Sequence, residues 1–510
     1  MNILRYYQED GTRECAEAFR DGHTQICRQL PTGGGKTVEF CHITNSYINK
    51  NQDSVLIVVD RIELLNQTKY KLYNEYNIIA FEIVSGVKYI PPSRVYIAMV
   101  ESLSKRITQL LPPGLILLDE CHMANFNKII DRINKKLLIG FTATPISSNK
   151  KEPLNKRYTK LIQGPQISEL ISNKFLSQNI TWAPRTGVDR SNLAMVGDDF
   201  DEVLMAKEYS NPKFVINTYD AYNRWSKGDK TIIYNVNISH SRLVYEEFLR
   251  HGLNVRQLDS TCSEEERLEI LKWFKSNPDA ILCNVGILTK GYDEPTVETI
   301  IVNKATNSLA LWLQMTGRGG RIIDIELAEE LNTFIKYSFK ILDLGQNAIT
   351  HGDWSDDRDW LSIFENPPKK SKNGVSPCKL CPSCEAILHA SVMECKFCNF
   401  VFPPREVMIE ELMSEYVVLT KNIDVEKIIE SGNNNKQYFT FFKVIREHVY
   451  LFNKTKRKVT PEIFEFILKE INEDCKKWCH LNNKKFNKFH QNLCFMELQK
   501  TLRYEHRVLQ

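Results

Sequence analysis

Three short motifs carry side chains that suit the chemistry of nucleotide phosphates. The sequence Asp119-Glu120-Cys121-His122 directly follows the wholly apolar run Leu115–Leu118. A glycine-rich segment, Leu30–Thr37, lies upstream of it, and an arginine-containing segment, Gln314–Arg321, lies downstream. The first two motifs could hold a triphosphate with its Mg²⁺, and the arginines of the third could meet the same phosphates from another domain. This order of motifs is typical of a nucleotide-driven motor.

The glycine-rich segment reads Leu30-Pro31-Thr32-Gly33-Gly34-Gly35-Lys36-Thr37 and lies between a predicted strand and a predicted helix. Gly33 and Gly35 permit backbone angles that are closed to residues with a Cβ, so successive N–H groups can turn towards phosphate oxygens. The helix start adds a positive dipole end, Lys36 would reach the β- and γ-phosphates, and Thr37 would bind Mg²⁺. A glycine-rich turn also arises by chance, so this motif taken alone leaves an ordinary turn open.

The pair Asp119-Glu120 supplies the groups that a phosphate-binding loop lacks. A strand that ends in two acids places one carboxylate, Asp119, to hold Mg²⁺ and the next, Glu120, to orient or deprotonate the attacking water. A solvated acidic loop is the alternative for such a pair taken alone. Two features favour the catalytic interpretation. The run before the pair is apolar, and the glycine-rich segment precedes the pair by the number of residues that the sheet of one domain typically occupies.

Arg318 and Arg321 are the predicted arginine fingers. A guanidinium is always charged and forks onto phosphate oxygens, so it can stabilise charge that develops on the γ-phosphate in the transition state. Two surface arginines on a glycine-rich loop are the alternative, which their three-residue spacing and the preceding Gln314 disfavour. We therefore place Gln314, Arg318 and Arg321 beside Glu120 as catalytic candidates.

The elements that must position these motifs are predicted from the apolar runs. In the first part of the chain the runs are continuous rather than alternating, which suits a parallel sheet covered on both faces by helices. Helical patterns between them complete the pattern of a doubly wound α/β domain. The predicted strands are Gln25–Leu30, Val55–Val59, Val95–Met99, Leu115–Leu118 and Leu137–Thr142, and the predicted helices include Lys36–Ile48 and Ile62–Glu75.

The same alternation recurs further along the chain, after a polar, lysine-rich stretch at Ser147–Lys160 that we interpret as a linker or flexible crossing. It predicts a second α/β domain. The predicted strands are Thr231–Val236, Val255–Leu258, Ala280–Asn284, Thr299–Asn303 and Phe339–Leu344, and the predicted helices are Ser241–Arg250, Ser263–Lys275 and Ser308–Gly317.

The 14 cysteines form one cluster among scattered single thiols, which indicates a reducing compartment and one metal site rather than a disulfide framework. Cys381-Pro382-Ser383-Cys384 and Cys395-Lys396-Phe397-Cys398 have the spacing C-x₂-C-x₁₀-C-x₂-C. Four such thiolates can close a tetrahedral, structural Zn²⁺ site. Cys378 is also spaced to pair with Cys381, so it is an alternative ligand to Cys384. Asn399, after the second pair, tolerates the positive φ that a knuckle often needs, whereas Glu385, after the first, suits it less.

Five segments together resemble the motifs of superfamily-2 helicases of the DEAD/DEAH type. Leu30–Thr37, Asp119–His122 and Phe141–Pro145 are similar to motifs I, II and III. Leu288–Pro295 is similar to motif V, and Gln314–Arg321 to motif VI. The resemblance is closest to helicases related to the XPB and type III restriction groups, many of which phages and bacteria carry. It implies two RecA-like domains with ATP and Mg²⁺ between them, and it places a Cys-Pro-x-Cys knuckle after the second, which favours Cys384 over Cys378.

The resemblance also implies roles near the first motif. Leu4–Gln8 resembles the family's N-terminal adenine-recognition motif, in which Gln8 would read the base edge and Arg5 or Tyr7 would pack against the ring. The two threonines of motif III, Thr142 and Thr144, would couple the nucleotide state to domain closure, with His122 touching the same network.

Further roles are implied for the second domain and for strand contacts. Gly291 and Asp293 would face the nucleotide across the cleft, and Thr289 would face the nucleic-acid strand. Arg61, in a segment similar to motif Ia, would contact phosphate. Ile97–Leu103 departs from the family, because Met99 and Glu101 stand where a threonine and a glutamine usually grip the strand.

The C-terminal region is basic, with sixteen Lys and Arg against eight Asp and Glu from Asn433 to the end. Its aromatic residues could follow nucleic acid, but aromatics at helical spacing usually pack, so a small helical domain with an aromatic core is the favoured interpretation. The aromatics in question, near Lys454–Lys458, are Tyr438, Phe439, Phe441, Phe442, Tyr450 and Phe452. The predicted domains are an N-terminal RecA-like ATP-binding domain (1–170), a C-terminal RecA-like helicase domain (175–360), a zinc knuckle (376–403) and a basic helical domain (405–510).

These observations predict an ATP-dependent helicase or translocase that acts on nucleic acid, with DNA favoured over RNA by the resemblance, together with replication, recombination or repair proteins. The alternatives are an ATPase that remodels or anneals strands without unwinding, the motor subunit of a restriction or repair complex, and an ATP-gated binding module. No run approaches the roughly 18 apolar residues of a membrane span, and Met1–Asp10 turns polar before a signal-peptide core forms. We therefore expect a cytoplasmic protein with no membrane partner, and the resemblance implies a bacterial or phage-infected host cytoplasm.

Overall fold

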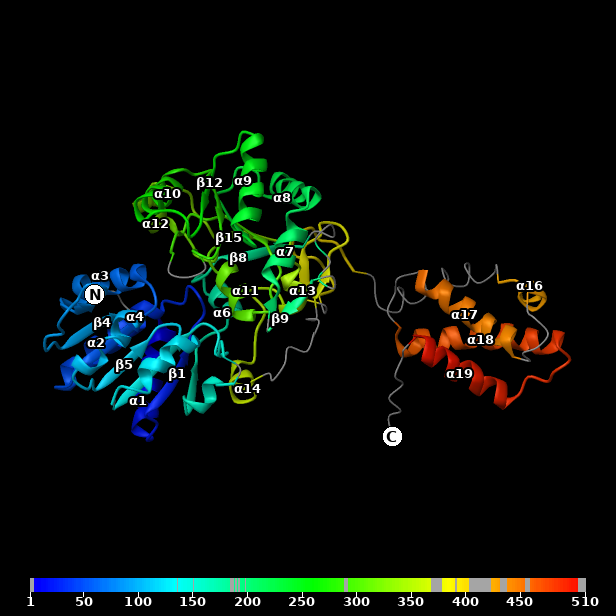
Figure 1. The fold of residues 1–510 in the computed structure, drawn as a ribbon, viewed down its shortest axis with the longest axis horizontal. Coiled ribbons are helices and arrows are strands. Elements are labelled where there is room, and N and C mark those ends of the chain that lie inside the picture. The colour runs from blue at the N-terminus through cyan, green and yellow to red at the C-terminus, as the bar shows by residue number, and fades with distance from the viewer. Residues whose placement is uncertain are drawn as a thin grey trace. The chain divides into compact units, whose positions relative to one another are not determined.

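The computed structural model describes residues 4–134, 136–149, 151–183, 188, 190, 193–197, 199–288, 292–367, 378–389, 392–402, 423–431, 438–454 and 459–502. The chain divides into two compact units, Met1–Cys398 and Asn399–Gln510. The first unit holds two α/β lobes, coloured blue to cyan and green in Figure 1, and a small cysteine-rich hairpin. The second unit is helical. No helix among the described residues is long and apolar enough to cross a membrane.

The first lobe is built on a seven-stranded parallel sheet with the order β3-β4-β2-β5-β6-β1-β7. Alternate residues of one strand pack into different cores: Leu56 and Val58 of β2 lie in one cluster, and Val55, Ile57 and Val59 in another. The sheet is therefore buried on both faces, which confirms the prediction from continuous apolar runs. The strands are β1 (Gln25–Gln29), β2 (Val55–Val59), β3 (Phe81–Ile83), β4 (Val95–Met99), β5 (Leu115–Leu118), β6 (Leu137–Thr142) and β7 (Lys160–Gln163).

The helices of this lobe are α1 (Tyr6–Arg20), α2 (Lys36–Lys50), α3 (Ile62–Tyr76), α4 (Val100–Ser104), α5 (Asn127–Ile130) and α6 (Ile167–Ser172). Of these helices, α1 precedes the first strand, α2 to α5 lie between strands in sequence, and α6 follows the last strand.

The stretch Ser147–Lys160, interpreted above as a linker, packs onto the first sheet instead. The Tyr158 side chain is buried, and a Cβ on Gly140 of β6 would lie 2.6 Å from its hydroxyl. The chain then enters β7, which pairs in parallel with β1. The linker prediction was wrong because it relied on the many polar residues of the stretch. The buried Tyr158 ring among them anchors the stretch to the sheet.

The second lobe contains a six-stranded parallel sheet with the order β12-β13-β11-β14-β15-β8. Neighbouring residues again face different cores, since Ile232 packs with the cluster shared by both lobes and Ile233 with a second cluster. The strands are β8 (Gln178–Trp182), β11 (Thr231–Asn235), β12 (Val255–Leu258), β13 (Ile281–Asn284), β14 (Thr299–Asn303) and β15 (Ser338–Asp343), and a separate hairpin is formed by β9 (Met195–Val196) and β10 (Asp199–Phe200).

Every described helix of the second lobe except α13 (Asn347–His351) begins after a residue whose side chain caps it. The Ser263 hydroxyl accepts a hydrogen bond from the Glu266 N–H, and the Glu266 carboxylate accepts one from the Ser263 N–H, a capping box that fixes the start of α10. The helices are α7 (Glu202–Tyr209), α8 (Pro212–Trp225), α9 (Ile238–Arg250), α10 (Glu264–Ser276), α11 (Leu309–Thr316), α12 (Ile325–Leu331), α13 (Asn347–His351) and α14 (Trp360–Glu365).

The first unit ends in an antiparallel hairpin of β16 (Cys378–Leu380) and β17 (Ile387–His389). The described residues of the second unit include the helices α16 (Val425–Glu430), α17 (Phe439–Lys454), α18 (Pro461–Leu481) and α19 (Lys488–Leu502). Phe441, Phe452 and Trp478 are buried in its core, whereas Phe439 and Tyr450 are more than half exposed. The packed interpretation therefore holds for Phe441 and Phe452, and residues 455–458 lie outside the described residues.

Candidate active site

The glycine-rich loop has the backbone conformation that a phosphate cradle requires. Gly33 and Gly35 have φ angles of 90° and 85°, in the left-handed region. A Cβ on Gly35 would lie 2.4 Å from the Gln8 amide nitrogen, so a side chain there would fill the cradle. The α2 helix begins at Lys36, directly after the loop, and Thr37 lies in its first turn. The N–H groups and the positive dipole end of α2 therefore meet the loop.

The start of α1 holds this loop in place. The Tyr7 hydroxyl donates a hydrogen bond to the Gly34 carbonyl at 3.0 Å, and the Gln8 Nε2 donates to the same carbonyl at 3.1 Å. The Gln8 Oε1 accepts from the Arg5 N–H at 3.0 Å. The Arg5 guanidinium carbon lies 4.5 Å from the centre of the Phe175 ring. The predicted adenine motif thus lies against the loop, and its recognition of a base stays a prediction.

The two acids lie at the end of the buried strand β5. The Lys36 Nζ is 3.5 Å from the Glu120 Oε1, so the loop lysine and the candidate base form an ion pair. The His122 Nδ1 is 3.2 Å from the Glu120 Oε2 and 2.9 Å from the Thr142 Oγ1. Glu120 has a φ of 51°, a conformation that non-glycine residues rarely adopt and that is common at functional turns. Lys36 of motif I and His122 of motif II therefore both contact the Glu120 carboxylate, and Thr142 of motif III is linked to it through His122.

Asp119 has the properties of a metal ligand. It is almost fully buried, and no described residue gives its Oδ1 a hydrogen bond. Burial and the neighbouring Glu120 raise the pKa of Asp119 to about 7, with Lys36 acting in the opposite direction. A divalent cation would supply the positive charge and the oxygen-directed bond that this carboxylate lacks. Asp119 and Thr37 therefore fit Mg²⁺.

The motif III threonines connect the acids to the loop strand. The Thr142 hydroxyl donates to the Thr144 carbonyl at 2.9 Å and accepts from the Thr144 N–H at 3.1 Å. The Gln29 amide donates to the Ala143 carbonyl at 3.2 Å. Hydrogen bonds therefore connect His122 to the end of β6, so a movement of His122 would be transmitted to that strand.

Arg321 reaches from the second lobe to the loop of the first. Its Nη1 donates to the Gly33 carbonyl at 2.7 Å. Its Nε and Nη2 donate to the two carboxylate oxygens of Asp293 at 2.8 and 3.1 Å. Burial opposes ionisation of Asp293, but the adjacent Arg321 outweighs it and lowers the pKa of that carboxyl. Arg321 of the second lobe thus contacts the same glycine-rich loop that ends at Lys36 in the first lobe.

The other motif V and VI candidates lie at the same junction. The Arg318 Nη1 donates to the Tyr292 carbonyl at 2.7 Å, and burial lowers the pKa of Arg318. Gln314 is buried, and its Nε2 has no hydrogen-bond partner among the described residues. Gly291 and Thr289 fall outside the described residues, so their predicted roles have no structural counterpart here.

Lys336 is a residue at this site that sequence reasoning missed. It is 3% exposed, and its Nζ donates to the Gly319 carbonyl at 3.0 Å and to the Val297 carbonyl at 2.6 Å. Burial lowers the pKa of Lys336 to about 7 despite nearby acids such as Glu298. This lysine ties the loop that carries both arginines to the chain that follows motif V. A lone lysine before a strand gives no signal in a single sequence.

Two more contacts join the lobes. The Arg61 Nη1 donates to the Ile287 carbonyl at 2.6 Å, and the Arg267 guanidinium lies 2.6 Å from the Glu63 carboxylate. Arg61 was predicted to contact phosphate, and in the structure it contacts the second lobe just before motif V. Motif Ia therefore takes part in the junction between the lobes.

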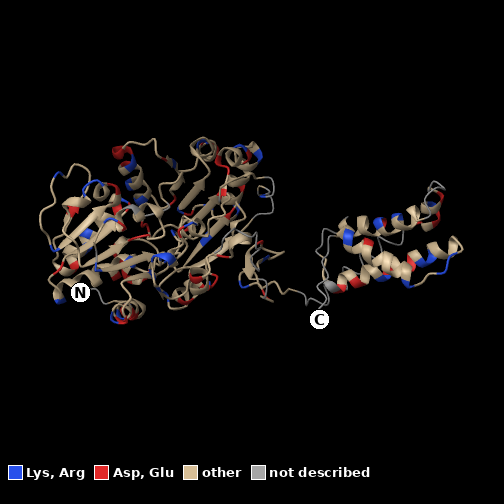
Figure 2. Cartoon of the chain, turned by 60° about the horizontal axis from the view of Figure 1, so that its bottom comes forward, with Lys and Arg blue, Asp and Glu red and all other residues tan. Residues whose placement is uncertain are grey.

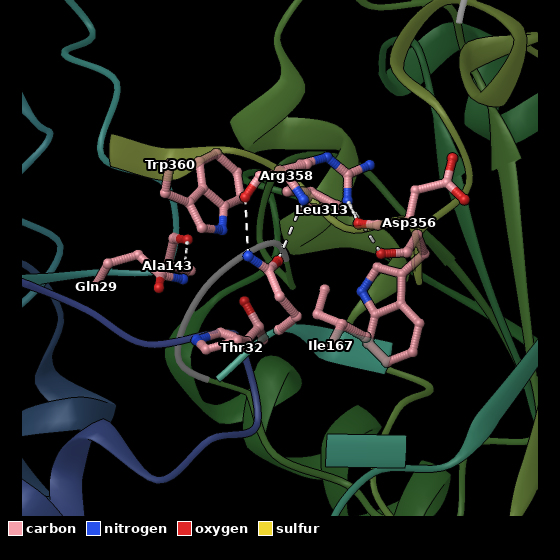
Figure 3. Close-up of a pocket in the computed structure, with 11 residues that line it drawn as sticks. Gln29, Thr32, Ala143, Ile167, Leu313, Asp356, Arg358 and Trp360 are labelled. Carbon is pink, nitrogen blue, oxygen red and sulfur yellow. Dashed lines mark hydrogen bonds between the residues drawn. The ribbon is translucent and has the colours of Figure 1, made fainter. Parts of the chain in front are cut away.

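A small cavity lies beside the loop at this junction (Figure 3). Thr32 lines it from the first lobe, and Gln166 closes it by donating to the Arg358 carbonyl at 2.9 Å and accepting from the Arg358 N–H at 3.2 Å. Lys36 and Arg321 do not line it. The cavity is therefore a packing feature behind the loop and not the place for a triphosphate.

Four cysteines gather at the end of the first unit. The Sγ atoms of Cys381, Cys384, Cys395 and Cys398 all lie within 4.8 Å of one another. Cys378 is not a member of the group, so the geometry favours Cys384 as the fourth ligand. The residues after the two pairs, Glu385 and Asn399, have φ angles of 62° and 57°. Glu385 therefore adopts the conformation that its side chain suits less well. The donor set and the knuckle turns fit Zn²⁺.

The comparisons with known proteins agree with this geometry. Residues 2–147 match the family described as the res subunit of type III restriction enzymes, and residues 213–323 match the helicase conserved C-terminal domain. The chain belongs to helicase superfamily 2. Within that superfamily it is related to the type III restriction group.

Relatives of this superfamily-2 chain include a yeast and a phage protein. Saccharomyces cerevisiae IRC3, named as an ATP-dependent helicase, is 30% identical over 345 residues, which is 63% of this chain and 50% of that protein. A 51.5 kDa protein of a Lactococcus phage (isolate 7-9) is 28% identical over 382 residues, which is 74% of this chain and 78% of that protein. The chain thus spans about half the length of the yeast relative.

A solved structure shares the fold. A fragment of a Vibrio vulnificus YJ016 protein, described as the HsdR subunit of a type I restriction enzyme, superimposes with a TM-score of 0.53 at 20% identity. The match covers 69% of this chain and 66% of the fragment. The solved fragment therefore shares the fold of this superfamily-2 chain.

Proposed function

We propose that this superfamily-2 protein is an ATP-dependent helicase or translocase that acts on DNA. The observation that carries the proposal is the Arg321 contact with the Gly33 carbonyl, because a cation of one lobe reaches the phosphate cradle of the other. A triphosphate in that cradle would lie between Lys36 and Arg321. Its charge would draw the lobes together, and its loss on hydrolysis would release them.

The site residues divide the chemistry between them. Triphosphate oxygens would compete with Glu120 for Lys36, which lies 3.5 Å from that carboxylate, and would free Glu120 to orient the attacking water. Mg²⁺ held by Thr37 and Asp119 would supply charge neutralisation on the phosphates. Arg321 would exchange the Gly33 carbonyl for the γ-phosphate, where its positive charge stabilises the transition state.

Movement along a strand would follow from the junction between the lobes. The hydrogen bond between His122 and Thr142, and the one that the Thr144 N–H donates to the Thr142 hydroxyl, would report the nucleotide state to the first sheet. Opening and closing the junction would change the distance between surfaces of the two lobes that hold successive phosphates of the strand. Because such contacts release counterions, we expect binding to weaken steeply with salt.

The proposal extends to the cofactors and the setting of the protein. ATP and Mg²⁺ would occupy the junction, and a structural Zn²⁺ would be held by the four clustered cysteines without an open coordination position. The phage relative supports a bacterial or phage-infected host cytoplasm. Replication, recombination or repair proteins are the proposed partners.

ATP hydrolysis measured with different nucleic acids tests the proposal. We expect single-stranded or forked DNA to stimulate ATPase activity more than RNA does, and a strand-displacement assay to show ATP-dependent unwinding. ATPase activity that is the same with and without every nucleic acid would contradict a nucleic-acid motor. Stimulation without unwinding would assign the protein to the remodelling or annealing alternative.

A second candidate is the motor subunit of a restriction or repair complex. The match of the first lobe to the res subunit family favours it. Isolation of the protein with a nuclease partner, and cleavage that depends on ATP, would support this role. The ATP-gated binding module is disfavoured, because Lys36, Glu120 and Arg321 converge in a geometry suited to turnover.

A further inference from the structure

The helical unit carries a concentrated cluster of positive charge. Between Cys475 and Met496 the chain has five lysines, two histidines and no aspartate or glutamate. The charged positions are coloured in Figure 2. In α18 and α19 the acidic residues lie on either side of this stretch, at Glu462, Glu465, Glu470, Glu473 and Asp474 before it and at Glu497 after it, where Glu497 pairs with Arg446 of α17. The end of α18 and the start of α19 therefore form a basic surface next to an acidic one.

Aromatic rings are exposed within this basic surface. Phe489 is 57% exposed, and its ring centre lies 6.3 Å from that of Tyr438. The Lys484 Nζ lies 4.3 Å from the centre of the Tyr438 ring, and Tyr438 stacks on the buried Trp478. Phe439, next to Tyr438 in sequence, is 52% exposed. An exposed aromatic ring among lysines can stack against the ring of a ligand.

The loop that presents these groups is held in one conformation. Asn483 has a φ of 52°, which ends α18, and the Lys484 N–H donates to the Cys479 carbonyl at 2.7 Å. The Asn487 Oδ1 accepts from the Phe489 N–H at 3.1 Å and lies 2.8 Å from the His490 Nδ1. The lysines and Phe489 are thus displayed on a preorganised turn, which lowers the entropy cost of binding.

We propose that this surface, formed by Lys476, Lys477, Lys484, Lys485, Lys488 and Phe489, binds single-stranded nucleic acid at a site separate from the motor. The lysines neutralise phosphates, and Phe489 stacks on a base. A single strand is the fitting ligand because its base faces are accessible, whereas a duplex hides them between neighbouring pairs. An acidic peptide would satisfy the lysines but would give the exposed ring no partner of comparable shape.

This site goes beyond the proposed function, because a second binding site would keep the strand bound to the protein while the two lobes open and close. It also differs in place from the surface suggested by the sequence near Lys454–Lys458. Phe441 and Phe452 from that suggestion pack in the core. The exposed ring and its lysines lie instead at the junction of α18 and α19.

The test uses the full chain with labelled dT and rU oligonucleotides, which distinguish DNA from RNA, and a duplex of the same length. One variant, Lys485→Glu with Lys488→Glu, reverses two exposed charges of the surface. The matched control, Lys469→Glu with Lys500→Glu, changes net charge equally at exposed positions outside it. A third variant, Phe489→Ala, removes the ring. Affinity without nucleotide is measured by fluorescence anisotropy over a range of salt.

We expect the Lys485→Glu/Lys488→Glu chain to bind dT roughly tenfold more weakly than the control, with a salt slope smaller by about 1.4. Phe489→Ala should weaken binding of dT by about tenfold and leave duplex binding unchanged. Equal affinities for variant and control, or an equal loss of duplex and single-strand binding in Phe489→Ala, would overturn the proposal.

The motor serves as an independent readout. Strand-stimulated ATPase of the Lys485→Glu/Lys488→Glu chain should reach the wild-type maximum, but at a higher oligonucleotide concentration. If the oligonucleotide concentration that gives half-maximal ATPase activity is unchanged, the second binding site is contradicted. Absence of stimulation in the wild-type chain would instead contradict the proposed function, so the two failures are distinguishable.

Discussion

The acids and the lysine of the first lobe are arranged so that a nucleotide with its cation would complete their contacts. Lys36 is paired with Glu120, and Asp119 keeps an oxygen without a hydrogen-bond partner among the residues described. The side-chain types at these positions were predictable, because phosphate chemistry restricts them to a lysine and two acids. The ion pair between them was not, since it depends on the positive φ of Glu120.

Glu120→Gln should bind ATP normally and hydrolyse it at least about a hundredfold more slowly, because the amide cannot act as a base. Lys36→Ala should instead lose nucleotide binding, since the cradle loses its cation. A fluorescent ATP analogue measures the affinity, and phosphate release measures turnover. Full turnover by the Glu120→Gln chain would remove the role assigned to this carboxylate.

Lys336 gives a pH-dependent prediction. Its folded pKa is lowered from 10.5 to about 7, so the folded chain binds fewer protons than the unfolded chain between these values. The contribution of Lys336 to stability is therefore complete above about pH 10.5 and is lost as pH falls towards 7, by at most about 1.4 kcal/mol per pH unit. The melting temperature of the wild type relative to Lys336→Met should rise between pH 7.5 and pH 9. A difference that does not change with pH would contradict a neutral buried amine.

At the scale of elements, the strands that are stabilised by apolar burial could be predicted from the sequence, whereas a strand held by polar contacts with a distant segment could not. The apolar strands β2, β4 and β5 have the bounds predicted from sequence, because burial on both faces selects continuous apolar runs. The strand β8 was missed because its buried Asn179 and Thr181 hydrogen-bond to Asp353, which is distant in sequence. A single sequence does not reveal a polar strand whose partners come from another segment.

The cysteine cluster yields a prediction with a built-in control. The wild-type chain should contain one Zn²⁺, and Cys384→Ser should lose it, because four thiolates close the site. Cys378→Ser should retain the metal, since Cys378 lies outside the group of four. Elemental analysis of the purified chains decides the matter. Loss of zinc from Cys378→Ser with retention in Cys384→Ser would reverse the assignment.

At the scale of the whole first unit, the lobes are joined by contacts that sequence motifs indicate only in part. The resemblance placed Arg321 opposite the nucleotide, and the structure brings it to the Gly33 carbonyl. The pairs that reinforce this junction, Arg61 with Ile287 and Glu63 with Arg267, come from segments far apart in sequence. Such pairings depend on how the two folded lobes pack together. Neither segment contains a sequence pattern that would predict them.

The most direct test of a nucleotide shared between lobes is single-turnover ATP hydrolysis by Arg321→Ala in the presence of single-stranded DNA. Arg242→Ala, which removes an exposed arginine of α9 in the same lobe, is the matched control. The shared site predicts that Arg321→Ala hydrolyses ATP about 10³-fold more slowly than the control while its ATP affinity stays within about threefold. Hydrolysis by Arg321→Ala at the rate of Arg242→Ala would contradict it.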